Sequence, residues 1–222
     1  MTESPVTQHL RSDLSIDQQV ALKTAATRLE REFDGTFGAE TIERFLHSSY
    51  DQFAGRATVA NFLPLLAERF ARQRLSALAR VEGKVADGKP TVLFLCTHNA
   101  GRSQMALGFF VHLAGENGRA WSGGSEPGNE INPAAIAAMA EVGIDITGEF
   151  PKPWTDEIVQ AADVVITMGC GDACPIFPGK RYENWDLPDP AGEAVDAVRP
   201  IRDDIEERVR LLLSDLGVEP SN

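Results

Sequence analysis

Residues 91–106, TVLFLCTHNAGRSQMA, constrain the fold more than any other stretch of the chain. The run TVLFLC is apolar and rich in β-branched residues but too short for a helix, so it predicts a buried strand. A small polar loop follows it, and residues 102–116 then show the apolar spacing of a helix. A strand that passes through a tight loop into a helix is typical of α/β folds, in which ligands bind where strands end.

The alternation of strand and helix continues toward the C-terminal end. Short apolar or β-branched runs predict three further strands, at 119–124, 163–169 and 182–187. Helical spacing predicts three further helices, at 132–143, 153–162 and 194–216. Asn132 is the candidate N-cap of the first, and Pro200 is a start or a kink in the last. Residues 91–222 are therefore expected to form an α/β domain with a four-stranded parallel sheet flanked by helices.

The N-terminal part has a different pattern. Amphipathic stretches at 15–33, 39–54 and 58–81 predict a small all-α bundle, a three-helix domain over residues 1–81. Residues 82–90, EGKVADGKP, are small and polar and end in proline, which predicts a linker. The arginines of the third stretch suggest DNA binding, but the acidic residues of the region offset them. We expect this domain to serve docking or homodimerisation.

Charge and composition narrow the setting of the protein. The formal net charge is −12, and residues 1–90 hold 12 acidic and 12 basic side chains, so the whole excess falls on residues 91–222. An acidic body of this kind argues against nucleic acid as a partner. Neither a signal peptide nor an apolar run of membrane-spanning length is present, so we expect a cytoplasmic protein without a membrane partner. Three cysteines do not suggest a structural disulfide framework.

The loop CTHNAGRS, residues 96–103, has the residues of an oxyanion site. Its backbone amides and the following helix N-terminus offer partial positive charge, and Arg102 can bind two oxygens at once. The same field favours the thiolate form of Cys96, to which Ser103 can donate. The plain alternative is a cysteine that caps a buried strand and an arginine on the surface. The predicted oxyanion-binding residues are Thr97, His98, Asn99, Ala100, Gly101, Arg102 and Ser103.

Cysteine, five residues, arginine and serine is the pattern of the low-molecular-weight protein tyrosine phosphatases, which this chain resembles over about residues 90–215. The continuation RSQMA is similar to the thioredoxin-coupled arsenate reductases built on that fold. The helical region resembles an extension found before this domain in some members. The resemblance implies arsenate as substrate, thioredoxin as reductant and no cofactor. Some such reductases bind potassium near the loop; an acidic ligand position of theirs is Leu107 here, so no metal is predicted.

The resemblance also implies a general acid near the C-terminal end, the aspartate of an Asp-Pro pair. Asp189-Pro190 stands at that place, with Asp186 as a nearby competitor and an ordinary turn as the plain alternative. The phosphatases carry aromatic residues directly after this pair, whereas Ala191 and Gly192 follow it here. The small residues favour a small inorganic oxyanion over a phosphorylated protein.

Cys170 and Cys174 lie in a loop rich in glycine and proline, after the strand predicted at 163–169. A zinc site would need a second pair of ligands, and two inert thiols are the other alternative. Paired thiols on an exposed loop fit a disulfide relay, so Cys96, Arg102, Asp189, Cys170 and Cys174 are the predicted catalytic residues. The sequence thus favours a thioredoxin-dependent arsenate reductase. A low-molecular-weight phosphatase and a non-catalytic oxyanion sensor are the alternatives.

Overall fold

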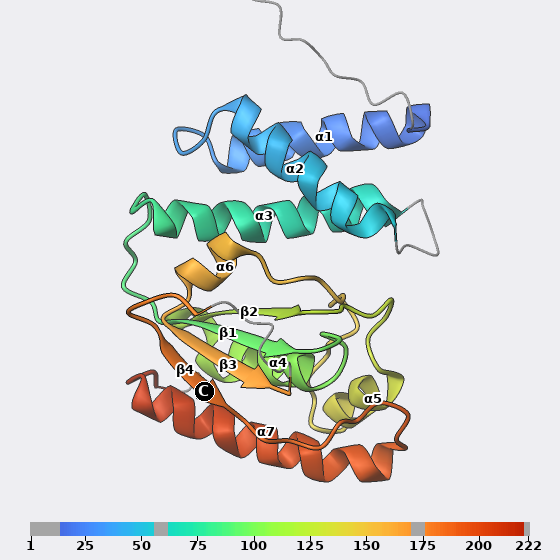
Figure 1. Ribbon diagram of the computed structural model, residues 1–222, viewed down its shortest axis with the longest axis vertical. Helices are drawn as coiled ribbons and strands as arrows, with labels where there is room; N and C mark the ends of the chain where they lie inside the picture. Colours follow the sequence, from blue (N-terminus) through green and yellow to red (C-terminus); the bar gives the residue numbers. More distant parts are fainter. Residues whose placement is uncertain (1–13, 56–61, 170–175, 220–222) are drawn as a thin grey trace, which may run out of the picture. The chain divides into compact units, whose positions relative to one another are not determined.

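The computed structural model describes residues 14–55, 62–169 and 176–219 (Figure 1). Its sheet has four strands: β1 Thr91–Cys96, β2 Arg119–Gly124, β3 Val164–Met168 and β4 Arg181–Asn184. Their order is β2-β1-β3-β4, and each neighbouring pair is parallel. The predicted four-stranded parallel sheet is therefore confirmed. β4 ends at Asn184, earlier than the sequence suggested, although the Trp185 amide still bonds the Thr167 carbonyl of β3 at 2.8 Å. Trp185 and Leu187 pack in the core.

Helices flank this sheet on both sides. They are α4 Arg102–Ala114, α5 Pro133–Glu141, α6 Asp156–Ala161 and α7 Val195–Asp215, with a 3-10 turn at Gly115–Asn117. Asn132 caps α5, as predicted, through its side-chain oxygen. α7 begins five residues before Pro200, so this proline lies inside the helix and does not start it. α6 lies on the opposite side of the sheet from α7 (Figure 1).

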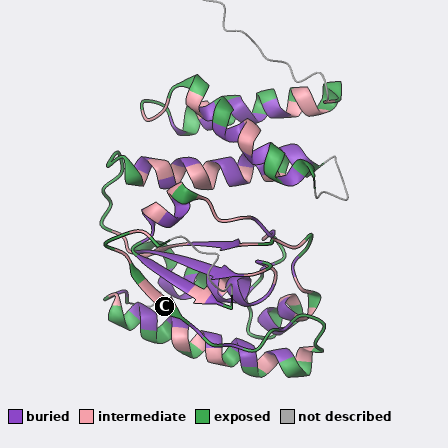
Figure 2. Cartoon of the chain, in the orientation of Figure 1, coloured by how far each residue is buried: buried purple, intermediate pink, exposed green. Residues whose placement is uncertain are grey.

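The core follows from the alternation of side chains along the strands. All six residues of β1 are buried, which is why its sequence is an unbroken apolar run (Figure 2). Val92, Phe94 and Cys96 face the cluster of apolar residues that α4, α5 and α7 bury against the sheet. The sulfur of Cys96 therefore lies at the carboxyl end of β1, on the side where α4 begins.

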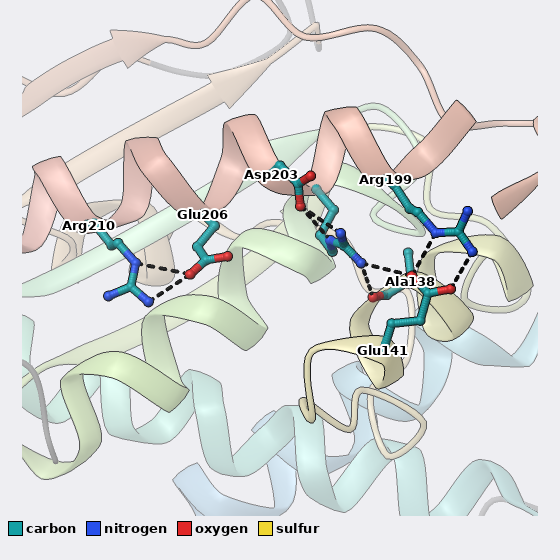
Figure 3. Close-up of polar contacts among 7 residues, drawn as sticks. Ala138, Glu141, Arg199, Asp203, Glu206 and Arg210 are labelled. Atoms are coloured by element: carbon teal, nitrogen blue, oxygen red, sulfur yellow. Dashed lines mark hydrogen bonds and ion pairs between the residues drawn. The ribbon is translucent and has the colours of Figure 1, made fainter. Parts of the chain in front are cut away.

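Ion pairs join α5 to α7 (Figure 3). Glu141, at the end of α5, accepts hydrogen bonds from Arg199 Nε and Nη2 at 2.8 and 2.6 Å. Arg202 Nη1 lies 3.1 Å from the same carboxylate and donates to the Ala138 carbonyl at 2.8 Å. Because Arg202 is buried, these bonds fix the end of α5 on the second and third turns of α7.

The N-terminal helices are α1 Ile16–Glu32, α2 Ala39–Ala54 and α3 Leu63–Val81. α1 starts with a capping box between Ser15 and Gln18. Contacts divide the chain into a unit over residues 1–72 and a unit over residues 73–222, so the division falls inside α3. The domain boundary predicted at residue 81 stays a prediction.

Arginines of α3 are paired with carboxylates in both units. Within the first unit Arg72 bonds Glu32 at 2.7 Å and Glu68 at 3.0 Å. Within the second, Arg74 pairs with Glu157 of α6, and Arg80 bonds Asp163 at 2.7 Å. Each of these three arginines is thus paired with a carboxylate of its own unit. Across the described ranges, every helix is too short or too polar to cross a bilayer.

Candidate active site

The loop between β1 and α4 is shaped by Asn99. Its backbone is left-handed, with φ of 47°, and its side chain is buried. The side-chain oxygen accepts from the Lys152 amide at 3.0 Å and from Gln104 Nε2 at 3.1 Å, and its Nδ2 donates to Ser103 Oγ at 2.9 Å. These bonds offset the cost of the left-handed backbone and hold the loop in a tight curve over the end of β1.

Cys96 lies at the floor of this curve, buried, with its sulfur 2.9 Å from Ser103 Oγ. Since Ser103 Oγ already accepts a hydrogen bond from Asn99, its own hydroxyl hydrogen is available to the sulfur. A hydroxyl that donates in this way stabilises a thiolate. The structure therefore brings together Cys96, Ser103 and Asn99 as the sequence predicted.

Arg102 opens α4 and is nearly buried, with 8% of its surface exposed. Its Nη1 donates to the Leu187 carbonyl at 3.2 Å, and its Nη2 lies 3.2 Å from Asp189 Oδ2. Its buried Nε has no hydrogen-bond partner among the described residues. A buried donor without a partner is costly unless an acceptor is bound there, so this geometry fits a ligand with several oxygens.

The amides of the loop complete this cradle. In the part of the chain that the structure describes, no backbone carbonyl accepts from the amides of residues 98–103. These N–H groups precede or open α4, where the helix dipole favours negative charge. A tetrahedral oxyanion above Cys96 is the kind of ligand that this arrangement can satisfy.

Asp189 approaches the loop from the segment before α7. Its Oδ1 accepts from the Ala191 amide at 3.1 Å, while its Oδ2 faces Arg102. Pro190 is buried against Gly101, where an added Cβ would lie 2.6 Å from Pro190 Cγ. Asp186 is exposed and lies near Arg208 of α7, so of the two candidate acids Asp189 is the one beside the loop.

A cavity of about 230 Å³ opens above the loop. Its lining residues include Cys96, Arg102, Asp189, Ala191 and Gly192. The small side chains of the last two form the wall where the phosphatase resemblance implies aromatic residues.

The remaining loop residues make contacts of other kinds. His98 is exposed, and its Nδ1 lies 3.0 Å from the Glu126 carbonyl oxygen. Thr97 Oγ1 donates to the Gly169 carbonyl at 2.9 Å. A Cβ on Gly169 would lie 3.0 Å from Arg102 Nη1, so the chain passes directly beside the guanidinium just before residue 170. Cys170 and Cys174 themselves lie outside the described residues.

Two contributions to the site were not anticipated from the sequence. Lys152 is fully buried and supplies an amide to Asn99, while its ammonium bonds Glu149 at 3.2 Å and the Phe150 carbonyl at 3.3 Å. Gln104 Nε2 links Asn99 to the same carbonyl, at 3.2 Å. No sequence motif marks either role. Where the structure describes the chain, no three histidine, cysteine or acidic side chains lie close enough to hold a metal.

Comparison with known proteins agrees with this geometry. Residues 91–221 match the model of the low molecular weight phosphotyrosine protein phosphatase family. The chain belongs to this family. Residues 22–79 match a second model, the N-terminal domain of protein-tyrosine-phosphatase-like proteins.

Several relatives carry a more specific name. The protein named arsenate reductase 2 of Staphylococcus epidermidis is 39% identical over 125 residues, which are 54% of this chain and 94% of that protein. A solved structure of a thioredoxin-dependent arsenate reductase of Corynebacterium glutamicum is 45% identical, with a TM-score of 0.79, over 88% of this chain and 96% of that one. A solved arsenate reductase in a phosphate-binding state is 36% identical, with a TM-score of 0.50, over 57% of this chain and 98% of that one.

Proposed function

We propose that this protein reduces arsenate to arsenite and is regenerated by a thioredoxin. The observation that carries the proposal is the cradle itself, which combines a buried cysteine with an Arg102 Nε and loop amides that find no acceptor among the described residues, beside a cavity of about 230 Å³. The names of the relatives support the same substrate, whereas the family membership fits the alternative, a low-molecular-weight phosphatase.

The first step is a displacement at arsenic. The Cys96 thiolate attacks, a sulfur–arsenic bond forms, and one arsenate oxygen leaves. Asp189 donates the proton that lets this oxygen depart as water, while Arg102 and the loop amides hold the oxygens that remain. Arg102 Nη2 lies 3.2 Å from Asp189 Oδ2, and this ion pair gives way when the guanidinium binds the oxyanion.

The second stage is a relay of thiols. Cys170 attacks the sulfur of Cys96, the sulfur–arsenic bond breaks, and its electron pair reduces arsenic from the +5 to the +3 state. Cys174 then attacks Cys170, which frees Cys96 and leaves a Cys170–Cys174 disulfide. A thioredoxin dithiol reduces this disulfide. The position of Gly169 beside Arg102 supports the relay, because the next residue in the chain is Cys170.

Arsenate turnover with thioredoxin, thioredoxin reductase and NADPH tests the proposal. We expect turnover by the wild type and loss of steady-state turnover in Cys96→Ser, Cys170→Ser and Cys174→Ser. Cys170→Ser should still form one sulfur–arsenic adduct, whereas Cys174→Ser should release one arsenite per chain and stop. Full activity in the last two variants would overturn the relay. Hydrolysis of aryl phosphates without arsenate turnover would make the protein a phosphatase.

We also propose a cellular location for the protein and a role for its N-terminal helices. The relay needs all three cysteines as free thiols at the start of each cycle, which suits the reducing cytoplasm. We propose that the first unit serves docking or homodimerisation, with the predicted domains at residues 1–81 and 91–222 joined by the linker 82–90. Analytical ultracentrifugation of the full chain tests the dimer.

A further inference from the structure

Asn132 occupies a junction of three parts of the active site. Its backbone N–H donates to the Ala100 carbonyl of the oxyanion loop at 2.9 Å. Its side-chain oxygen accepts from the Ala134 and Ala135 amides at 2.8 and 3.4 Å, which starts α5. Its Nδ2 donates to the Pro190 carbonyl at 2.8 Å. The N-cap role of Asn132 explains the bonds that its side-chain oxygen accepts from Ala134 and Ala135. It does not explain the bond from Nδ2 to the Pro190 carbonyl, in the turn that holds the general acid.

We propose that Asn132 is a positioning residue of the general acid, which fixes the Asp189–Pro190 turn to the oxyanion loop. This inference rests on the proposed function, in which Asp189 supplies a proton to the leaving oxygen. Asp189 is half exposed, with 51% of its side chain accessible, whereas Pro190 is buried. The buried Pro190 therefore fixes the position of the Asp189 carboxyl beside it.

The bond from Asn132 matters most when the oxyanion is bound. Arg102 also holds the turn, through the Leu187 carbonyl and the Asp189 carboxylate. Once its guanidinium binds oxyanion oxygens, and once Asp189 is protonated to act as an acid, the ion pair between them is lost. The bond from Asn132 to the Pro190 carbonyl involves neither charged group, so it persists through the reaction.

α5 carries this restraint because it is fixed at both ends. Its first residue follows Asn132, and its last residue, Glu141, bonds Arg199 and Arg202 of α7 (Figure 3). The general-acid turn follows α5 in the chain and precedes α7, the helix to which the end of α5 is bonded. The amide of Asn132 thus has little freedom to follow the turn if the turn moves, and a displaced turn loses the bond.

A double-mutant cycle tests this role. Asn132→Ser keeps an N-cap oxygen but is too short to reach the Pro190 carbonyl. It is compared with Asp189→Asn and with the double variant, by kcat and KM for arsenate in the thioredoxin-coupled assay. We expect Asn132→Ser to lower kcat by about tenfold with KM changed less than about twofold, and to cost less than about twofold in the Asp189→Asn background. An equal loss in both backgrounds would overturn the proposal.

Asn132→Ala separates the bond to Pro190 from the start of α5. It removes both, so its Tm should fall below that of Asn132→Ser while its kcat equals that of the serine variant. A further kcat loss in the alanine variant would show that the helix start matters instead. If the wild type turns over no arsenate, the proposed function alone fails. The same cycle is then read on hydrolysis of p-nitrophenyl phosphate, whose leaving oxygen takes its proton from the same acid.

Discussion

Substitution of Gly101 by alanine is the sharpest test of how the site is assembled. A Cβ at this position would lie 2.6 Å from Pro190 Cγ, whereas ordinary contacts begin at about 3.4 Å, so the two groups must separate by about 0.8 Å. The proline ring is rigid and buried, and it cannot rotate away as the end of a long side chain can. The displacement therefore falls mainly on the Asp189–Pro190 turn, because the bonds of Asn99 to Lys152 and Gln104 hold the loop.

The size of the effect follows from this displacement. A misplacement of about 1 Å in a reacting group can cost about 100-fold in rate. We expect kcat for arsenate to fall by about 10- to 100-fold in Gly101→Ala. KM should change much less, since Arg102 and most of the loop amides that bind the oxyanion keep their places. Steady-state kinetics measure kcat and KM for arsenate, and inhibition by phosphate measures the affinity for the oxyanion. Together they separate a loss of rate from a loss of binding.

Gly128→Ala is the matched control. It also lies near the loop, but an added Cβ there would make only ordinary contacts, at 3.7 Å from the His98 carbonyl and 3.8 Å from Ala100 Cβ. This variant should keep the wild-type kcat and KM. The reasoning is refuted if Gly101→Ala retains kcat within about twofold, or if its loss lies in oxyanion affinity alone.

Three further changes test other parts of the molecule. Ser103→Ala removes the hydroxyl 2.9 Å from the Cys96 sulfur, so alkylation of Cys96 by iodoacetamide at pH 6 should slow by about tenfold; an unchanged rate would contradict the donor role. Lys152→Met loses the bond from its ammonium to a buried carbonyl, and urea unfolding should show a loss of about 1–2 kcal/mol; equal stability would contradict this. Hydrogen bonds from Arg199 hold the pKa of Glu141 at about 2. Glu141→Gln should therefore have a lower Tm than the wild type at pH 7, and the difference should vanish as pH falls from about 4.5 to about 2; a difference independent of pH would show that the charge plays no part.

The loop was accessible from sequence because its chemistry is local. Cys96, Asn99, Arg102 and Ser103 lie within eight consecutive residues. A strand and a helix on either side of them leave few ways to arrange the backbone. The same reasoning applies to β1 and β3, since a buried parallel strand is an apolar run that can be recognised by itself.

The residues that hold the loop in place could not be predicted from the sequence, because they come from distant segments of the chain. Nothing around Lys152 in the sequence indicates that its side chain is buried or that its amide reaches Asn99, 53 positions away. Asn132 was recognised as a helix cap, a local role, while its bond to Pro190 spans 58 positions. Contacts over such separations depend on the packing of whole elements, which periodicity does not encode.

The ion pairs of α3 bear on how the chain can be divided. A fragment that begins at Thr91, where the phosphatase-family match begins, would lack Arg74 and Arg80 and would leave Glu157 and Asp163 without their cations. A fragment that begins at Gln73, where the contacts divide the chain, would retain both pairs. The last turns of α3 therefore serve as the outer layer of the catalytic unit, although they match the family model of the domain that precedes it. An expressed fragment of the catalytic unit should therefore begin at Gln73 or earlier, so that these ion pairs are kept.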